Sequence, residues 1–366
     1  MVEWKKLGEV CKVHTGSQLN KTDMIEEGPF PVVNGGKEYS GYTDKFNENA
    51  CTITISQGGE SAGFVNWIGV SFWAGAHCYV VEIPKGYNTR YLYHTLKNKE
   101  RDIQLSKQGA GIPGLNRDTL YKQVIPIPSL EEQTRIVGIL DTFTSAIDNL
   151  KEQIAQRRKQ YEYYRDELLD LEGKEGVEMK TLGEVCVIGD GLHGTPIYNE
   201  TGDYFFINGN NLGNGKILIK SDTKKVDDTM FSKYGIELDN KTILMSINGT
   251  IGNIAVYNGE KIILGKSAAY FKIFKDDVIL YRFLYYLLQT TNSNNYYMES
   301  LTGTTIKNLG LKALRNYVFP LPPLQEQQRI VSILDTFEAS IQNLEAQLEQ
   351  RQKQYEYYRN KLLTFE

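Results

Sequence analysis

Two long stretches of the chain place apolar residues at alternating intervals of four and three positions. The first stretch covers residues 136–171 and the second covers residues 330–365. This spacing is typical of a coiled-coil heptad, and each stretch sustains it for about five heptads. Pro128 precedes the first stretch, and Gly173 follows it as a stop signal. The pattern therefore predicts two long helices, each a rod of about 60 Å.

The two predicted helices are near copies of one another. Residues 126–169 and 320–363 align at an offset of 194 and are identical at 28 of 44 positions. Residues 7–11 and 182–186 share the sequence Leu-Gly-Glu-Val-Cys at an offset of 175, so the second half has 19 more residues between these markers. We interpret the chain as an internal duplication with pseudo-two-fold symmetry, in which the globular parts have diverged and the helical parts have not.

The sequence leaves two arrangements of these helices open. They can pack on each other as an antiparallel coiled coil, because residues 178–323 lie between them and let the chain return. Alternatively, each helix can lie on its own globular domain. Five uninterrupted heptads exceed the length that one small domain covers, so the length favours the coiled coil.

The rest of the sequence forms two β-rich parts. Short runs of β-branched and aromatic residues predict strands, and frequent glycines predict the turns between them. Residues 90–96 and 282–288 predict a matching helix late in each part. The predicted fold class is α+β, with two β-rich α/β domains joined by two long helices in an antiparallel coiled coil. The predicted segments are the domain 1–130, the helix and linker 131–177, the domain 178–323 and the helix 324–366.

Polar loops recur at matching places in the two β-rich parts. Asn and Gln side chains can pair with adenine, Lys with guanine, and Ser or Thr with either base, so these loops suit the reading of DNA base edges. Gly, Asn and Ser are also common turn residues, which is the alternative explanation at each single position. The predicted DNA-binding residues are His14, Gln18, Asn34, Lys37, Ser56, Gln57, Lys107, His193, Thr195, Asn208, Asn210, Asn211, Asn248, Thr250, Lys266, Thr304, Thr305 and Lys307.

Motifs for catalysis are missing from the sequence. It has no P-loop, no H-E-x-x-H zinc motif, and no Asn- or Asp-Pro-Pro-aromatic tetrapeptide of a DNA methyltransferase. Residues 109–114 match G-x-G-x-x-G, but they contain Pro113 and open no long helix. Asp170, Glu172 and Lys174 faintly resemble a nuclease cluster, at what is more simply a charged helix end. The four histidines lack metal-ligand spacing, so we expect a binding protein without a catalytic or metal site.

Cysteine spacing and hydropathy bear on the compartment. The four cysteines show no C-x-x-C spacing, which argues against a zinc ribbon and against a secreted disulfide scaffold. The longest apolar runs fall far below the ~18 residues of a membrane span, and no apolar stretch follows the first residues. We therefore expect a cytoplasmic protein with no membrane partner.

The formal net charge of −4 is unevenly distributed along the chain. Residues 1–130 and 178–323 each carry a net charge of +1, whereas residues 131–177 carry −4 and residues 324–366 carry −2. The acidity therefore belongs to the helices and not to the predicted DNA-reading domains. Because phosphate neutralisation supplies much of non-specific affinity, we expect this chain to bind DNA weakly by itself and to rely on basic partner subunits.

The repeated segments carry a recognisable motif. Both read P-x-P-x-L-x-E-Q-x-R-I-V-x-I-L-D and continue to Q-Y-E-Y-Y-R. Two variable domains separated by such near-identical segments resemble the specificity subunit of type I restriction-modification enzymes, and the resemblance extends over the whole chain. It implies that the variable domains are target recognition domains, each reading one half of a bipartite, asymmetric DNA site. It also implies that the coiled coil fixes the gap between the halves and that this subunit has no catalytic site.

The same resemblance implies the partners. Two modification subunits would bind this chain and methylate adenine with S-adenosylmethionine, and restriction subunits would add ATP-driven translocation and cleavage. S-adenosylmethionine, ATP and Mg²⁺ would therefore bind the partner subunits, and this chain would bind no cofactor. An internal duplication presents equivalent surfaces to two copies of one partner. The predicted partner-interface residues are Glu132, Gln133, Arg135, Glu326, Gln327 and Arg329.

Two functions of other classes remain as alternatives. A stand-alone coiled-coil scaffold would be stable without partners and would not change DNA mobility. A self-sufficient nuclease or methyltransferase would act on DNA alone, and the missing motifs argue against it.

Overall fold

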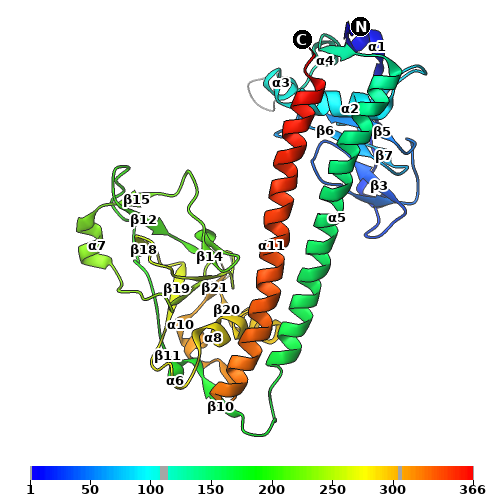
Figure 1. Ribbon diagram of the computed structural model, residues 1–366. Coiled ribbons are helices and arrows are strands. Elements are labelled where there is room, and N and C mark those ends of the chain that lie inside the picture. The colour runs from blue at the N-terminus through cyan, green and yellow to red at the C-terminus, as the bar shows by residue number, and fades with distance from the viewer. Residues whose placement is uncertain (1, 108–113, 304–306, 366) are drawn as a thin grey trace. The chain divides into compact units, whose positions relative to one another are not determined.

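The chain is organised as two compact units that both contain parts of the two long helices. The computed structural model describes residues 2–107, 114–303 and 307–365. Unit 1 comprises Met1–Glu152 and Glu345–Glu366, and unit 2 comprises Gln153–Leu344. The long helices are α5 (Leu130–Leu169) and α11 (Leu324–Leu363), of 40 residues each (Figure 1). The G-x-G-x-x-G segment lies almost entirely outside the described residues.

Unit 1 contains the first globular domain, called domain 1 below. Its elements are β1 (Glu3–Lys6), α1 (Leu7–Val10), β2 (Lys12–Thr15), η1 (Lys21–Asp23), β3 (Phe30–Val33), β4 (Gly41–Thr43), β5 (Thr52–Ser56), β6 (Val65–Ile68), β7 (Trp73–Ala74), β8 (Cys78–Glu82), α2 (Thr89–Asn98), α3 (Glu100–Leu105), α4 (Arg117–Tyr121) and β9 (Val124–Ile127). An antiparallel sheet has the order β2-β8-β5-β6, and a smaller sheet has the order β4-β3-β7 with β3 and β7 parallel. A third sheet pairs β1 with β9 and brings the start of the domain beside the segment before α5.

Unit 2 contains the second globular domain, called domain 2 below. Its elements are β10 (Glu178–Thr181), α6 (Leu182–Val185), β11 (Cys186–Asp190), β12 (Tyr204–Ile207), η2 (Gly209–Asn211), β13 (Leu212–Gly213), β14 (Lys216–Ile217), β15 (Lys225–Val226), α7 (Asp228–Tyr234), β16 (Ile243–Ser246), β17 (Ile254–Val256), β18 (Ile262–Leu264), β19 (Ala268–Ile273), α8 (Tyr281–Leu287), α9 (Thr291–Glu299), β20 (Leu301–Thr302), β21 (Asn308–Leu309), α10 (Leu311–Asn316) and β22 (Val318–Leu321). Its sheets have the orders β11-β19-β16-β17, β15-β12-β18 and β10-β22, and β13-β14 and β20-β21 form two further two-stranded sheets.

The two domains share one topology. Each sheet of domain 1 has a counterpart in domain 2 with the same strand order, including the parallel pair β12 and β18 that matches β3 and β7. Strands β5 and β16 are central and almost wholly buried, which suits their β-branched and aliphatic sequences. Domain 2 adds the hairpin β13–β14 between β12 and β15. The duplication expected from the sequence is therefore visible in the fold.

The two long helices pack against each other with opposite directions in each unit. In unit 1, the ring of Phe143 in α5 stacks on Tyr358 in α11, with centroids 5.1 Å apart and planes at 22°. In unit 2, Phe337 in α11 stacks on Tyr164 in α5, at 5.5 Å and 27°. The second pair is the first pair with its helices exchanged, because both residues shift by 194 positions. The predicted fold class, two β-rich domains with an antiparallel coiled coil and an internal repeat, is confirmed.

Each domain also packs on the long helix that follows it in sequence. Ile136 and Leu140 of α5 are fully buried in the core of unit 1, and Ile330 and Leu334 of α11 are fully buried in the core of unit 2. The end of α11 reaches the unit 1 core through Leu363. The two arrangements considered for the helices therefore occur together, because each helix contacts both a domain and the other helix.

Two further features bear on the earlier expectations. No helix in the described part of the chain is both long enough and apolar enough to cross a membrane. All four cysteines are free thiols, and burial raises the pKa of Cys11 and of Cys186, its counterpart in domain 2, to about 12. These two thiols are therefore protonated structural groups at neutral pH.

Candidate nucleic-acid interface and partner surfaces

The first candidate loop of each domain packs tightly against the small sheet. An added Cβ at Gly16 would lie 2.3 Å from the carbonyl oxygen of Ala74, and one at Gly191 would lie 2.0 Å from that of Leu264. Such distances are far below van der Waals contact, so only glycine permits this approach of two backbones. These contacts fix the start of the loop that carries Gln18, directly after the strand residue His14, and the start of the loop that carries His193 and Thr195.

An asparagine at the end of the central strand of the small sheet is anchored in the same way in both domains. In domain 1, Oδ1 of Asn34 accepts a hydrogen bond from the backbone N–H of His77, at 3.0 Å. In domain 2, Oδ1 of Asn208 accepts from Oγ of Ser267, also at 3.0 Å. Both side chains are half-buried. The oxygen of each amide is thus held, and among the described residues the Nδ2 donor of each has no protein partner.

The loop after the central strand of the large sheet meets a distant segment in both domains. Gly58 pairs with Gly114 as an isolated bridge in domain 1, and Asn248 pairs with Asn308 in domain 2. The side chain of Asn248 also donates through Nδ2 to the carbonyl oxygen of Lys266, at 3.2 Å. These contacts bring the middle candidate loop of each domain beside the described end of its late candidate loop.

The structure places most of the predicted DNA-binding residues where a ligand can reach them. The exposed or half-exposed candidates are His14, Gln18, Asn34, Lys37, Gln57, Lys107, His193, Thr195, Asn208, Asn210, Asn248, Thr250, Lys266 and Lys307. Thr304 and Thr305 lie outside the described residues. This exposure is compatible with a role in binding.

Two candidates are placed in the interior instead. Ser56 is 5% exposed at the end of β5, and Asn211 is 6% exposed. The Nδ2 group of Asn211 donates to the carbonyl oxygen of Leu218 and to the hydroxyl of Thr223, at 3.1 and 3.3 Å. The expectation that Ser56 and Asn211 contact DNA is therefore wrong for this structure, because one side chain is covered and the other holds its own loop together.

Several exposed candidates already have partners within their domain. Nε2 of His14 lies 2.9 Å from a carboxylate oxygen of Glu48, and Nδ1 lies 3.2 Å from one of Glu82. His193 pairs with Asp190 at 2.7 Å. Lys107 donates to the backbone oxygen of residue 60, at 2.9 Å. A carboxylate beside each histidine disfavours close approach of a phosphate, so these histidines are better suited to contacts with base edges.

The sequence patterns missed three residues that the structure brings to these surfaces. His77 and Ser267 hold the anchored asparagines, and both occur singly in turns, where spacing gives no signal. Arg117 is exposed, donates to the hydroxyl of Thr15 at 3.3 Å, and lines a cavity of about 590 Å³ together with Gln57. The position of Arg117 shortly after the late candidate loop was a feature of the sequence that could have identified it.

The predicted partner-interface residues include an exposed ion pair that is repeated in both units. Arg135 binds the carboxylate of Glu132 through Nε and a terminal nitrogen, each at 2.7 Å. Arg329 and Glu326 repeat this geometry at 2.8 and 2.7 Å. The hydrogen bond from the arginine lowers the pKa of Glu132 and of Glu326, so both carboxylates stay charged near neutral pH. Each unit thus displays the same pair of charges at the start of a long helix.

The two predicted interface glutamines lie in the interior. Gln133 is 2% exposed, accepts from the backbone N–H of Asn88 and donates to the carbonyl oxygen of Pro128, both at 2.9 Å. Gln327 is fully buried, accepts from the N–H of Leu280 at 2.9 Å, and donates to two backbone carbonyls. The expectation that they face a partner is therefore wrong, because both side chains are used to fix the domain to its helix.

A buried polar cluster fixes domain 1 to both helices of unit 1. His94 in α2 lies 2.8 Å from Asp141 through Nε2 and 2.9 Å from the hydroxyl of Tyr355 through Nδ1. Burial is the main cause that lowers the pKa of His94, and the charges of Arg90 and Arg359 act in the same direction. The neutral ring then donates a hydrogen bond from Nε2 to the carboxylate of Asp141 and accepts one at Nδ1 from the hydroxyl of Tyr355. This cluster joins α2, α5 and α11 within unit 1.

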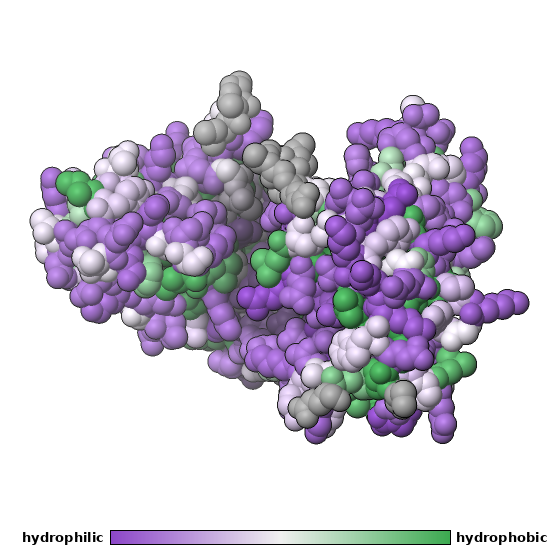
Figure 2. All heavy atoms as spheres, turned by 90° about the horizontal axis from the view of Figure 1, so that it is seen from above, coloured by the Kyte–Doolittle hydropathy of each residue, from purple (hydrophilic) through white to green (hydrophobic). Residues whose placement is uncertain are grey.

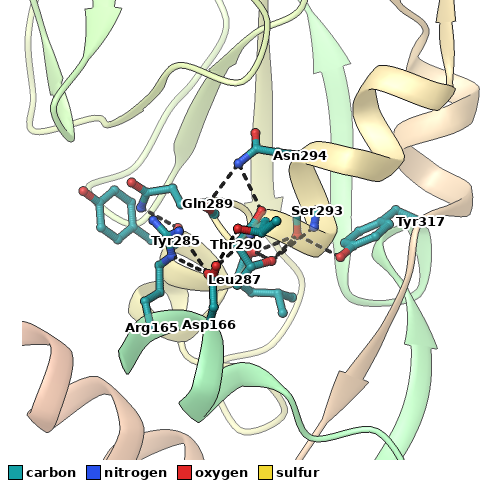
Figure 3. Close-up of polar contacts among 10 residues, drawn as sticks. Arg165, Asp166, Tyr285, Leu287, Gln289, Thr290, Ser293, Asn294 and Tyr317 are labelled. Carbon is teal, nitrogen blue, oxygen red and sulfur yellow. Dashed lines mark hydrogen bonds and ion pairs between the residues drawn. The ribbon is translucent and has the colours of Figure 1, made fainter. Parts of the chain in front are cut away.

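Unit 1 also pairs Arg90 with Asp141, at 2.7 Å, and unit 2 keeps this arginine–aspartate pair at the equivalent place with Glu338 added to it. Arg282 binds Asp335 at 2.5 Å and Glu338 at 2.6 Å, and the hydroxyl of Tyr286 donates to Asp335 at 2.6 Å. Farther along the unit, Asp166 of α5 accepts hydrogen bonds from the backbone N–H and the hydroxyl of Thr291, at 3.3 and 2.5 Å. Figure 3 shows this carboxylate beside the turn between α8 and α9, where Thr290, Ser293 and Tyr317 form a linked set of hydrogen bonds. Domain 2 is thus held by α5 as well as by α11.

The surface offers no evident site for a metal ion. No group of three or more His, Cys, Asp or Glu residues in the described segments is arranged to hold one. Figure 2 shows polar side chains over most of the face in view, with apolar side chains in small separate patches. A polar surface of this kind is compatible with the wet, polar character of protein–DNA interfaces.

Known proteins are similar to this chain in sequence. A family model described as the type I restriction modification DNA specificity domain matches residues 1–157 and 174–351. A protein of Haemophilus influenzae named as a type I restriction enzyme specificity subunit is 30% identical, over 100% of this chain and 96% of that protein. The type I restriction enzyme EcoR124I/EcoR124II specificity subunit of Escherichia coli is 28% identical, over 100% and 94%.

Solved structures agree with this match at the level of the fold. The crystal structure of the S subunit of a type I restriction-modification system from M. genitalium covers 100% of this chain and 97% of its own, with a TM-score of 0.63 and 20% identity. The family model covers most of the chain, and the duplicated domains and paired helices described above match the architecture of that subunit. The chain belongs to the family of type I restriction-modification specificity subunits.

Proposed function

We propose that this chain gives its restriction-modification complex its DNA sequence specificity by reading a bipartite target. Domain 1 reads one half-site and domain 2 reads the other. The observation that carries the proposal is that one loop arrangement occurs twice on two domains of the same topology, with different side chains, whereas the helices are nearly identical. Divergence of the two globular domains beside closely similar helices is what two different half-sites require.

The loop chemistry supports direct reading of bases. Asn34 and Asn208 are held by their amide oxygens, and their amide donors have no partner among the described residues, while Gln57 and Lys37 add donors in domain 1. Such side chains recognise the distinct donor and acceptor patterns of the major groove. Because each domain carries a net charge of only +1, this subunit supplies specificity and its partners supply most of the affinity.

The paired helices provide a spacer between the two half-sites. A helix rises 1.5 Å per residue, so a coiled coil of defined length fixes a separation along DNA. The buried clusters that tie each domain to both helices support this role, because a spacer works only if the domains are rigidly attached to it.

The partners proposed for the chain are two modification methyltransferase subunits and the restriction subunits that complete the complex. The repeated ion pairs Glu132–Arg135 and Glu326–Arg329 are the proposed docking points, one for each methyltransferase copy. In this proposal the chain itself is not catalytic and binds no cofactor. S-adenosylmethionine, ATP and Mg²⁺ bind the partner subunits, and the complex acts on double-stranded DNA in the cytoplasm.

Co-expression of this chain with an adenine methyltransferase subunit of its restriction-modification system tests the proposal. Methylation-sensitive sequencing of the host DNA should then reveal methylated adenines within one bipartite motif. The methyltransferase expressed alone should leave that motif unmethylated. Methylation that does not depend on this chain, with no change in DNA mobility, would favour the scaffold alternative. Methyl transfer or cleavage by the purified chain alone would show that it is an enzyme.

A further inference from the structure

Domain 2 carries a lysine-rich insertion that domain 1 lacks. In domain 1, residues 34–40 connect β3 to β4 and contain one lysine and one glutamate, for a net charge of zero. In domain 2, residues 208–224 connect β12 to β15 and contain Lys216, Lys220 and Lys224 against Asp222, for a net charge of +2. The following residue, Lys225, is basic as well. The basic charge of the domain is therefore concentrated beside one loop.

The insertion is held against the candidate reading loop by specific hydrogen bonds. The buried amide of Asn211 reaches the carbonyl oxygen of Leu218 and the hydroxyl of Thr223, at 3.1 and 3.3 Å. The backbone N–H of Leu218 returns a bond to the carbonyl oxygen of Asn211, at 2.7 Å. The Thr223 hydroxyl also accepts from the N–H of Lys220, at 2.8 Å. These contacts make the insertion a rigid neighbour of Asn208 and Asn210.

The register of the small sheet places two of the lysines at the reading end of β12. The backbone N–H of Phe206 donates to the carbonyl oxygen of Lys224, at 2.8 Å. Lys224 therefore lies beside the end of β12 that leads to Asn208. The ammonium of Lys220 lies 3.4 Å from the backbone oxygen of Asn210. In Figure 1, β12, β15 and β18 form the small sheet that carries this end.

These two ammonium groups are available for a ligand. Lys220 and Lys224 are exposed, and within the described segments neither forms an ion pair with a carboxylate. Lys261, at the opposite end of the same sheet, pairs instead with Asp203 at 3.7 Å. Unpaired cations fixed beside polar base-reading groups are the arrangement by which proteins position themselves on the DNA backbone.

We propose that Lys220 and Lys224 bind DNA phosphates next to the half-site read by domain 2, so that the insertion adds phosphate contacts beside the candidate reading loop of this domain. This inference rests on the proposed function. Phosphate contacts fix register and orientation but carry no sequence information, whereas base contacts specify. Domain 1 has no insertion at the equivalent position, and its shorter loop carries a single lysine, Lys37, which is a candidate base contact.

The test measures the salt dependence of DNA binding by the assembled complex. The complex of this chain with its methyltransferase is titrated onto a duplex carrying the target found by methylation sequencing, at several salt concentrations. We expect Lys220→Gln and Lys224→Gln each to weaken binding and to reduce the slope of log K against log salt by about one, and the double variant by about two. Lys261→Gln is the matched control and should keep the wild-type slope.

The outcomes separate this inference from the proposed function. If the wild-type complex does not select the methylated target, the proposed function fails. If it does and the double variant keeps the wild-type slope, the lysines do not contact phosphate and the inference alone fails. If a lysine variant changes the methylated sequence, the side chain reads a base, which also overturns the inference. An equal loss of slope in Lys261→Gln would show a general charge effect instead of a local contact.

Discussion

At the scale of single residues, the duplication separates positions that the fold needs from positions that are free to diverge. Asn34 and Asn208 keep one residue type and one anchoring role, although the partners differ, a backbone N–H in one domain and a hydroxyl in the other. The helix junction keeps the aspartate of α5 and α11 but exchanges His94 for Tyr286. Equivalent geometry is thus maintained by different side chains.

The close approach of Gly16 and Gly191 to the small sheet gives a first prediction. Gly16→Ala or Gly191→Ala places a methyl group against a backbone carbonyl that cannot move aside. Either change should lower the free energy of unfolding by about 1–3 kcal/mol. The matched control is Gly138→Ala in α5, where an added Cβ meets nothing within 4 Å and helix propensity should stabilise the chain by about 0.5–1 kcal/mol. Chemical denaturation measures all three, and an unaffected Gly191→Ala variant would contradict the packing described.

The buried histidine of unit 1 gives a pH-dependent prediction. Burial, assisted by Arg90 and Arg359, lowers the pKa of His94 in the folded chain, so the folded state binds fewer protons than the unfolded state. Stability is therefore lost as the pH falls through the unfolded value of about 6.5. We expect the denaturation midpoint of the wild-type chain to decrease when the pH is lowered from about 7.5 to about 5.5. The midpoint of the His94→Gln variant, whose side chain can still donate to Asp141, should decrease less. An equal fall in both proteins would exclude His94 as the source.

At the scale of secondary-structure elements, the periodicity and the internal repeat of the sequence were enough to predict the long helices and the duplication. The heptad spacing predicted both long helices, and their close similarity predicted the duplication. The loop contacts had no such signal, because Asn34 meets His77 and Gly58 meets Gly114 only through the order of strands in the sheets. The roles of Gln133 and Gln327 were missed for another reason, since a shared motif does not reveal which of its polar side chains faces inward.

The inward glutamine and the outward arginine of one helix turn should therefore behave differently. Gln133→Leu leaves the backbone N–H of Asn88 and the carbonyl of Pro128 without their buried partner, which should cost about 1–3 kcal/mol of stability. Arg135→Glu reverses an exposed charge and should change stability by no more than about 0.5 kcal/mol. Only Arg135→Glu should reduce the amount of methyltransferase that co-purifies with the chain while the chain itself stays stably folded. If the double variant Arg135→Glu and Arg329→Glu still co-purified normally with the methyltransferase, the two ion pairs would not be its docking points.

At the scale of the whole molecule, the family match and the duplicated domains support a division between reading heads and a spacer. Lengthening the spacer tests this division. Insertion of one heptad into α5 and one into α11 preserves the apolar seam and adds about 10 Å of helix, which corresponds to about three base pairs of DNA. Methylation sequencing should then show the same two half-sites with a gap longer by about three base pairs. An unchanged gap in a complex that still methylates DNA would show that the helices do not set the spacing.

The central claim is that each domain reads one half of the target independently. The most direct measurement is methylation sequencing of cells in which Asn208 and Asn248 of domain 2 are replaced by alanine, with Asn34→Ala and Gln57→Ala in domain 1 as the reciprocal pair. The account predicts that the domain 2 changes alter or relax one half of the methylated motif and leave the other half intact, and that the domain 1 changes do the reverse. A change in both halves from substitutions in one domain would contradict it.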